Sequence, residues 1–311
     1  LYRVNGETGA VSKVPLVVNI PASLVGAPKG PTGQVFNGTS NFVVSQGSAS
    51  GPALFIFAAL NGTISGWNPS VPPPPPSTTA QLAATGTPPP AIYTGLAMGT
   101  SSQGVVLYAA NPAAGRVDVF DRNFVQIHLS GSFSDPALPT GDAPFNIVNL
   151  DGRLFVTYQG PTGVVNIFDT DGQFISRFAT GGTLHNPWGI VLAPPQFGKF
   201  SNALLIGNFN HSPAGFNGPG YISAFNSVSG EFRGLLDDTN GNPVTMDGLW
   251  SLRFGNGQNG GIPTVLYFSA GIGSAPGVGI ETHGLFGSFR PCAAANGGQT
   301  CQPEGLSADP R

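Results

Sequence analysis

An internal repeat constrains the fold of this chain more than any other feature of the sequence. Four segments share the frame Gly-x-[Ile/Val]-x-x-[Phe/Trp]-[Asp/Asn], in which apolar and polar residues alternate up to a turn-forming residue. This pattern predicts a β-strand that leads into a hairpin. The copies recur about every 50 residues, which is typical of repeated supersecondary units. They are GTISGWN from Gly62, GRVDVFD from Gly115, GVVNIFD from Gly163 and GYISAFN from Gly220.

Further strand-like segments flank each copy of the frame. One follows it after the turn, and a pair precedes it, as WGIVLAP and ALLIGNF precede the copy at Gly220. A fifth such pair, LWSLRFG and TVLYFSAG, occurs late in the chain. Four antiparallel strands that recur at this period are typical of one blade of a β-propeller.

The strand count predicts an all-β, six-bladed β-propeller whose first blade is incomplete in this chain. About 21 of the 24 strands are present, if LYR at the start and His283–Phe289 near the end are third strands. The missing strands are the first and second of the opening blade and the fourth of the closing blade. Because an open ring exposes strand edges, we expect either an upstream segment or a neighbouring copy to supply them.

The composition favours short strands joined by many turns. The 311 residues include 46 Gly and 30 Pro, and only 9% are charged. A content of 22 Phe and 40% apolar residues argues for a packed core rather than disorder. We therefore expect one propeller domain over residues 1–289 and a C-terminal tail over residues 290–311.

The few charged residues are unevenly distributed. The net charge is −3, and no Asp, Glu, Lys or Arg lies between Gly30 and Gly115. Such a surface does not bind a phosphate backbone, which excludes nucleic acid as a partner. This uncharged surface has two interpretations. In the first it is a face that binds a polysaccharide, a cell-surface ligand or another protein, and in the second it is a plain Ser/Thr/Asn surface. No run of about 18 apolar residues is present, so we expect no membrane span.

The cysteines and the glycosylation sequons favour an extracellular location. Cys292 and Cys301 are spaced for a local disulfide loop. Metal binding is the alternative, but no further Cys or nearby His completes a set of four ligands. Three Asn-x-Ser/Thr sequons predict a secreted glycoprotein, although this composition produces about three by chance. The sequon residues are Asn37, Asn61 and Asn210.

Several segments closely resemble a family of secreted bacterial and fungal conserved hypothetical proteins with six-bladed β-propellers. These segments are NPWGIVLAPPQFGKFSNALLIGNF, DGLWSLRFGNGQNGG, LYFSAG and ETHGLFGS. The resemblance covers Leu1 to Phe289 and implies the propeller fold, an exported location and a part of the protein upstream of Leu1. It implies no agreed activity. Some bacterial members carry a C-terminal surface-sorting signal, which the tail from Arg290 lacks.

The propeller topology predicts where a functional site would lie. Loops from fourth to first strands and from second to third strands open on one face, around the mouth of the central channel. Glu281 and His283 are two apart in extended chain and point the same way, so with Asp247 they could hold calcium or another divalent ion, or act as an acid/base pair. In the alternative interpretation these residues cap strand ends or pack in satisfied polar pockets. The predicted polar cluster is Asn146, His185, Asp247, Glu281 and His283.

Two classes of function remain after these arguments. The first is an extracellular binding or assembly protein, structural, surface- or polysaccharide-associated, that self-associates through strand complementation of the incomplete blade. The second is a calcium-assisted hydrolase or lyase at the channel mouth. The scarcity of titratable residues favours the first class, because catalysis needs several of them in perturbed environments. Trp188 and Trp250 precede equivalent strands and are expected to pack between blades, with a sugar platform as the alternative.

Overall fold

The computed structural model describes residues 2–21, 30–88, 91–210, 219–271 and 284–291. Its helices in these ranges are two 3-10 turns, η1 (Pro112–Ala114) and η2 (Gly198–Phe200), and the rest of the regular structure is β-strand. No described helix has the length and apolar character needed to cross a bilayer. The chain has an all-β propeller fold, as the repeat predicts. It divides into two compact units, unit 1 with Leu1–Val14, Gly160–Val164 and Phe178–Arg311, and unit 2 with Pro15–Gln159 and Val165–Arg177.

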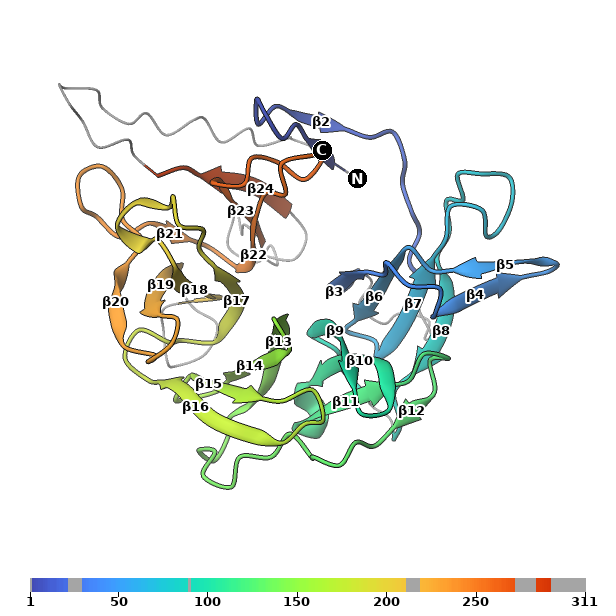
Figure 1. Cartoon of the computed structure of the whole chain (residues 1–311), viewed down its shortest axis with the longest axis horizontal. Coiled ribbons are helices and arrows are strands. Elements are labelled where there is room, and N and C mark those ends of the chain that lie inside the picture. The colour runs from blue at the N-terminus through green and yellow to red at the C-terminus, as the bar shows by residue number, and fades with distance from the viewer. Residues whose placement is uncertain (1, 22–29, 89–90, 211–218, 272–283, 292–311) are drawn as a thin grey trace, which may run out of the picture. The chain divides into compact units, whose positions relative to one another are not determined.

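Unit 2 contains blades 1 and 2 and most of blade 3, each a sheet whose strands neighbour one another in chain order (Figure 1). Blade 1 consists of β3 (Pro31–Phe36), β6 (Phe55–Ala59), β7 (Thr63–Trp67) and β8 (Gln81–Thr85). Blade 2 consists of β9 (Gly95–Ser101), β10 (Gly104–Asn111), β11 (Arg116–Phe120) and β12 (Gln126–Ile127). Blade 3 consists of β13 (Ala143–Leu150), β14 (Arg153–Gln159), β15 (Val164–Phe168) and β16 (Phe174–Thr180).

Unit 1 contains blades 4 and 5. Blade 4 consists of β17 (Pro187–Leu192), β18 (Ala203–Asn208), β19 (Gly220–Asn226) and β20 (Phe232–Leu235), and β21 (Thr245–Met246) also pairs with β19. Blade 5 has three strands in the described part of the chain, β22 (Leu249–Phe254), β23 (Leu266–Gly271) and β24 (Gly284–Phe289).

The prediction of six blades was wrong for the described residues, which form five blade sheets. The LYR segment, predicted as a third strand, is β1 (Tyr2–Val4), and it pairs with β2 (Val11–Lys13) in a separate two-stranded sheet. The Val4 N–H donates to the Asn259 carbonyl (3.0 Å), and Val4 packs against Val265 in blade 5. The hairpin is thus attached to blade 5 rather than being part of a sixth four-stranded sheet. In the described part of the chain, the sheet of blade 5 ends at β24.

A second two-stranded sheet is inserted in blade 1 between β3 and β6. Its strands, β4 (Val43–Gln46) and β5 (Ala49–Pro52), project from the blade as a hairpin (Figure 1). The base of the hairpin is anchored because Phe42 and Val44 are buried in the apolar core of unit 2.

The Asp or Asn that ends each copy of the frame closes the hairpin that follows it. Asp121 Oδ1 accepts the backbone N–H groups of Asn123 (2.8 Å) and Val125 (2.9 Å). Asp169 and Asn226 accept backbone N–H groups in the same way after β15 and β19. Short polar side chains at these positions stabilise turns by replacing backbone acceptors. The predicted turn-forming role of this residue is therefore confirmed.

Aromatic side chains fill the core of unit 2. Phe120 and Phe168, at the aromatic position of the frame, are fully buried, and Trp67 at the same position is 5% exposed. The Phe120 ring meets Tyr93 edge to face at 6.1 Å between centroids, and Phe168 meets Phe133 at 5.4 Å. Burial of one such side chain stabilises the fold by about 1.5–3 kcal/mol. The frame thus supplies one core residue in each of blades 1 to 4, and Phe225 in blade 4 is 5% exposed.

The first strands of neighbouring blades in unit 2 approach each other closely, and β9 contacts both β3 and β13. A Cβ atom on Gly95 would lie 2.2 Å from Asn146 Oδ1, and one on Gly33 would lie 2.6 Å from the Leu96 nitrogen. Any side chain at either position would clash, so glycine allows the strands to come together.

Three aromatic residues pack together in unit 1, where blades 4 and 5 meet. Trp188 and Trp250 pack edge to face, with ring centroids 5.2 Å apart and an interplanar angle of 89°. Phe209 adds a second edge-to-face contact with Trp250 at 4.9 Å. The prediction that the two tryptophans pack between blades is confirmed.

Candidate functional site

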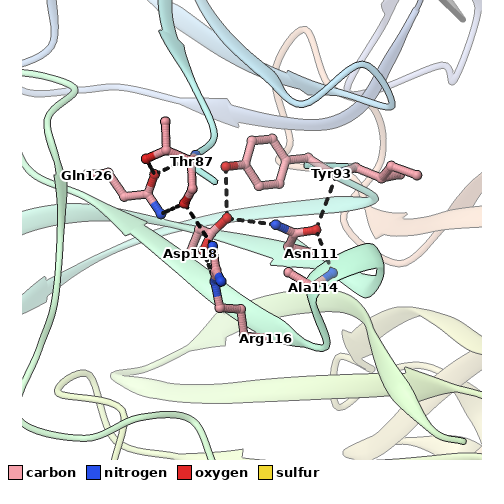
Figure 2. A network of polar contacts seen from close by, with 8 residues as sticks. Thr87, Tyr93, Asn111, Ala114, Arg116, Asp118 and Gln126 are labelled. Atoms are coloured by element: carbon pink, nitrogen blue, oxygen red, sulfur yellow. Dashed lines mark hydrogen bonds and ion pairs between the residues drawn. The ribbon is translucent and has the colours of Figure 1, made fainter. Parts of the chain in front are cut away.

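A group of polar side chains surrounds Asp118 on β11 (Figure 2). Asp118 Oδ2 accepts hydrogen bonds from the Tyr93 hydroxyl (3.0 Å) and Asn111 Nδ2 (2.8 Å). Its Oδ1 accepts from Arg116 Nε (2.6 Å), and the Asp118 side chain is only 2% exposed. A buried carboxylate is stable only when donors compensate its charge, as these three do. We call Tyr93, Asn111, Arg116 and Asp118 the blade-2 network.

Strand geometry brings these residues together. Arg116 and Asp118 are two apart on β11, so their side chains lie on the same face of the sheet. Asn111 is opposite Arg116 in the β10–β11 register. Tyr93 comes from the segment that connects β8 to β9, and its ring reaches Asp118 across the blade (Figure 2).

The blade-2 network also holds the described parts of this connecting segment, residues 86–88 and 91–94, against blade 2. The Thr87 N–H and hydroxyl donate to Gln126 Oε1 (3.0 and 2.9 Å). Arg116 donates to the Thr87 carbonyl (2.8 Å), and the Ile92 N–H donates to Asn111 Oδ1 (3.3 Å). The network, together with Gln126 on β12, therefore ties the chain that leaves blade 1 to the second, third and fourth strands of blade 2.

Two buried tyrosines of unit 2, Tyr93 and Tyr108, stay protonated at ordinary pH. Burial, and then the charge and the hydrogen bond of Asp118, raise the pKa of Tyr93 far above its usual value. Burial likewise raises the pKa of Tyr108, with smaller contributions from the charges of Asp171 and Asp169. Both phenols act as hydrogen-bond donors, and neither is a general base near neutral pH.

Blade 4 contains an equivalent arrangement in unit 1. Asn208 ends β18, and its Oδ1 accepts the backbone N–H of His185 (2.8 Å) from the segment that enters the blade. Asn208 Nδ2 donates to Ser223 Oγ (3.3 Å), and the Ser223 hydroxyl bonds to Thr183 Oγ1 (2.8 Å). Ser223 occupies the position of the frame that Asp118 occupies in blade 2. We call Thr183, Asn208 and Ser223 the blade-4 network.

In blade 3 the carboxylate comes from the entering segment and not from the third strand of the blade. Asp135 lies in the segment between β12 and β13 and accepts from Asn166 Nδ2 (3.1 Å) and from the Arg177 guanidinium. The Ala137 N–H also donates to Asp135 (2.9 Å), and Arg177 donates to the Ala137 carbonyl (2.7 Å). Burial opposes ionisation, but the hydrogen bonds from Arg177, Ala137 and Asn166 outweigh it and hold the pKa of Asp135 below its usual value.

Sequence reasoning missed most of these residues, although the repeat contained a signal for them. The fourth position of the frame is polar in all four copies and buried in all of them. A polar residue repeated between apolar neighbours on a core strand indicates a shared hydrogen-bonding role. The exposed fractions are 1% for Ser65, 3% for Asp118, 0% for Asn166 and 0% for Ser223.

The predicted channel-mouth cluster is divided between the two units and the undescribed residues. Asn146 is buried on β13 in unit 2. His185 precedes β17, and Asp247 is exposed in the turn between β21 and β22, both in unit 1. Glu281 and His283 lie outside the described residues. Within the described ranges, His, Cys, Asp and Glu do not gather in a group of three or more that could hold a metal ion. The calcium site stays a prediction.

The structure separates the three sequons by their exposure. Asn37 is 3% exposed and Asn210 is 1% exposed. Asn61 is partly exposed in the turn between β6 and β7. The predicted disulfide between Cys292 and Cys301 lies outside the described residues.

The blade-2 and blade-4 networks satisfy their polar groups and hold backbone segments, so they are structural contacts rather than an open reaction site. Asp118 already accepts three hydrogen bonds and Asn111 uses both ends of its amide. A metal ion or substrate would have to displace these donors. These contacts therefore hold the segments that enter blades 2 and 4, and a function is to be sought at the edges and exposed faces of the blades.

Comparisons with known proteins give relatives and fold neighbours but no family. No family model matches the sequence. The chain is 31% identical over 278 residues to an uncharacterized protein of Acanthamoeba polyphaga mimivirus, covering 81% of this chain and 65% of that protein. A second uncharacterized protein of the same virus is 29% identical over 242 residues, covering 72% and 60%. The chain thus spans less than two thirds of the length of these curated relatives.

Among solved structures, the chain is similar to a protein of unknown function from Bacteroides caccae. The TM-score is 0.47 with 11% sequence identity, and the match covers 76% of this chain and 68% of that chain. At this level of similarity the neighbour contributes no argument about function. The propeller assignment rests on the repeated sheets themselves.

Proposed function

We propose that this protein is a secreted, extracellular binding and assembly module that associates with further copies of itself by strand addition to blade 5. One observation carries the proposal. Within the described residues blade 5 has three strands, whereas the other blades each have a path of four. A sheet that ends early offers the backbone N–H and C=O groups of its edge strand to a partner strand.

The sequence of β24 supports pairing at this edge. GLFGSF contains no charged residue, and charge on an edge strand is a common protection against pairing. The fourth strands β16 and β20 carry such a charge in Arg177 and Arg233. The Phe289 ring stacks on Phe268 of β23 at 4.8 Å, which supports β24 as a regular strand.

The uncharged surface of blade 1 supports binding of a polysaccharide or another uncharged cell-surface ligand. Phe36 at the end of β3 is 58% exposed and packs edge to face on Phe55 at 5.8 Å. Leu82 on β8 and Val43 on β4 are also about half exposed. Aromatic rings with polar neighbours and no charge suit neutral ligands such as sugars. All of these residues lie in the region from Gly30 to Gly115 that has no charged residue.

The self-association is tested by placing charges on β24. Gly284 and Ser288 are exposed, and a Cβ on Gly284 meets no atom within 4 Å. We expect concentration-dependent association of the wild-type chain in analytical ultracentrifugation, and monomers for the double variant Gly284→Lys/Ser288→Lys. The matched control, Ser40→Lys/Ser48→Lys, adds the same charge at exposed positions of unit 2 and should associate like the wild type. A wild-type chain that is monomeric at every concentration contradicts the proposal.

The ligand class is tested by retention on insoluble chitin and cellulose. Phe36→Ala should reduce the retained fraction, whereas Val228→Ala, at a residue 92% exposed outside the uncharged region, should not. Equal retention of both variants, or none of the wild type, would remove the polysaccharide from the proposal. The metal-assisted hydrolase or lyase with Asp247, Glu281 and His283 stays a prediction.

A further inference from the structure

We infer that Asn61 is the glycosylated sequon of this chain, and that Asn37 and Asn210 carry no glycan in the folded protein. The inference rests on the extracellular location proposed above. An N-linked glycan is bulky and hydrophilic and is joined to the side-chain nitrogen of Asn. The folded structure must therefore leave that nitrogen accessible.

Asn37 fails this requirement because its side chain is part of the core of blade 1. It is 3% exposed, and its Nδ2 donates to the carbonyls of Asn41 (3.0 Å) and Ala53 (2.8 Å). A glycan on this nitrogen would break both hydrogen bonds and leave buried carbonyl groups without a donor. It would also force a hydrated chain into the apolar packing around Phe42.

Asn210 fails the requirement because its side chain is buried in unit 1. It is 1% exposed, and its Oδ1 accepts from Asn186 Nδ2 (2.8 Å). Asn186 in turn accepts the Gly160 N–H (3.1 Å), so the Asn210 amide belongs to a buried chain of hydrogen bonds in unit 1. A glycan on the Asn210 nitrogen would force a hydrated chain into this buried site.

Asn61 meets the requirement. It is partly exposed in the turn between β6 and β7, where its Oδ1 accepts from the Thr63 hydroxyl (2.6 Å) and the Thr63 N–H (3.3 Å). Both contacts use the amide oxygen, and Nδ2 makes no hydrogen bond among the described residues. Gly62 has φ of +73°, and a Cβ there would lie 2.5 Å from the Ala91 carbonyl oxygen. The turn therefore requires glycine after Asn61 and leaves the Asn61 side chain partly exposed.

The position of Asn61 also gives the glycan a physical role. It lies in the region from Gly30 to Gly115, which has no charged side chain to keep molecules apart in solution. A hydrated glycan on this blade would supply the missing polar bulk. The unglycosylated chain is accordingly expected to aggregate more readily than the glycosylated one.

The inference is tested by secreting the 311-residue chain from yeast. Intact mass is measured before and after peptide-N-glycosidase, and peptides released in heavy-oxygen water locate each modified Asn. We expect one glycan, at Asn61, which is lost in Thr63→Ala and retained in Thr63→Ser. Asn61→Gln provides a second glycan-free variant at a partly exposed position. A folded, secreted chain with unmodified Asn61, or with a glycan on Asn37 or Asn210, overturns the inference.

The same preparation separates this inference from the assembly proposal. Sedimentation is measured on the secreted chain before and after removal of the glycan. A chain that carries a glycan on Asn61 but sediments as a monomer supports the glycosylation site and contradicts strand addition at β24. A chain that associates but leaves Asn61 unmodified contradicts the site and supports the assembly.

Discussion

The blade-2 and blade-4 networks hold the same kind of entering segment with different chemistry. In both, an Asn at the end of the second strand accepts a backbone N–H from the segment and donates to a third-strand residue. That residue is Asp118 in blade 2 and Ser223 in blade 4. The carboxylate is compensated by Arg116 and Tyr93, whereas the neutral hydroxyl is satisfied with Thr183 as its further partner.

In both blades the strand register places the third-strand residue next to the Asn that ends the second strand. Whether this third-strand residue is charged differs between the blades, and its other partners differ accordingly. Blade 3 places Asn166 at the same position of the frame and takes its carboxylate, Asp135, from the entering segment instead. The energetic consequences differ, because removing one member of a buried charged group costs about 3–5 kcal/mol. The loss of one neutral hydrogen bond costs about 1 kcal/mol. The following predictions test this difference.

The largest effect is expected for Asp118→Ala. This change leaves the Tyr93 hydroxyl and Asn111 Nδ2 without their acceptor and Arg116 without its counter-ion. Because Arg116 is 37% exposed and can be hydrated, we expect the lower end of the range, a loss of about 3 kcal/mol in the free energy of unfolding. Urea denaturation at neutral pH measures it. A loss no larger than that of Ser223→Ala would show that the charged hydrogen bonds of the blade-2 network contribute no more to the free energy of unfolding than neutral ones.

The next effect distinguishes the two asparagines. Asn111→Asp places a second carboxylate where Nδ2 now lies 2.8 Å from Asp118, whereas Asn208→Asp faces the Ser223 hydroxyl, which can donate to it. We expect Asn111→Asp to lose about 2 kcal/mol more than Asn208→Asp at pH 7. Urea denaturation at pH 7 measures both losses, and equal losses would contradict the difference in charge between the two networks.

The contacts of Asp135 in blade 3 provide a test by pH. The pKa of Asp135 is lowered in the folded state, so its ionised form stabilises the fold above the unfolded pKa of about 4. Asp135→Asn should lower the free energy of unfolding by about 1.5 kcal/mol at pH 7, because hydrogen bonds to a charged group are lost. The difference between wild type and variant should shrink as the pH falls below about 4, through the folded pKa. Urea denaturation from pH 7 to pH 3 measures it, and a constant difference would contradict the assignment.

The smallest effect is expected in the blade-4 network. Ser223→Ala removes the hydroxyl between Asn208 and Thr183 and should cost about 1 kcal/mol, with no dependence on pH between 4 and 8. Ser48→Ala, at an exposed position in the turn between β4 and β5, is the control and should be neutral. Thermal unfolding compares the two variants. A pH-dependent loss for Ser223→Ala would reveal a charged partner that the comparison does not include.

The sequence alone determined the strands and their turns. Every segment predicted as a first or second strand of a blade contains one, from β3 and β6 in blade 1 to β22 and β23 in blade 5. The Asp and Asn residues at the end of the frame close the predicted hairpins, as Asp121 does. These features are local, because alternation along one strand and the chemistry of one turn involve residues close together in the chain.

Only the tertiary structure decided the number of blades, the partners of the buried polar residues and the exposure of the sequons. β1 pairs with β2 and contacts blade 5, and the sequence of β1 alone does not determine these partners. Asp118 meets Tyr93 and Thr87 meets Gln126 across 25 and 39 positions of sequence. Asn37 and Asn61 have the same Asn-Gly-Thr sequon, but Asn37 is buried and Asn61 is partly exposed. Each of these outcomes depends on contacts between segments that are far apart in the chain, and a local sequence pattern does not determine such contacts.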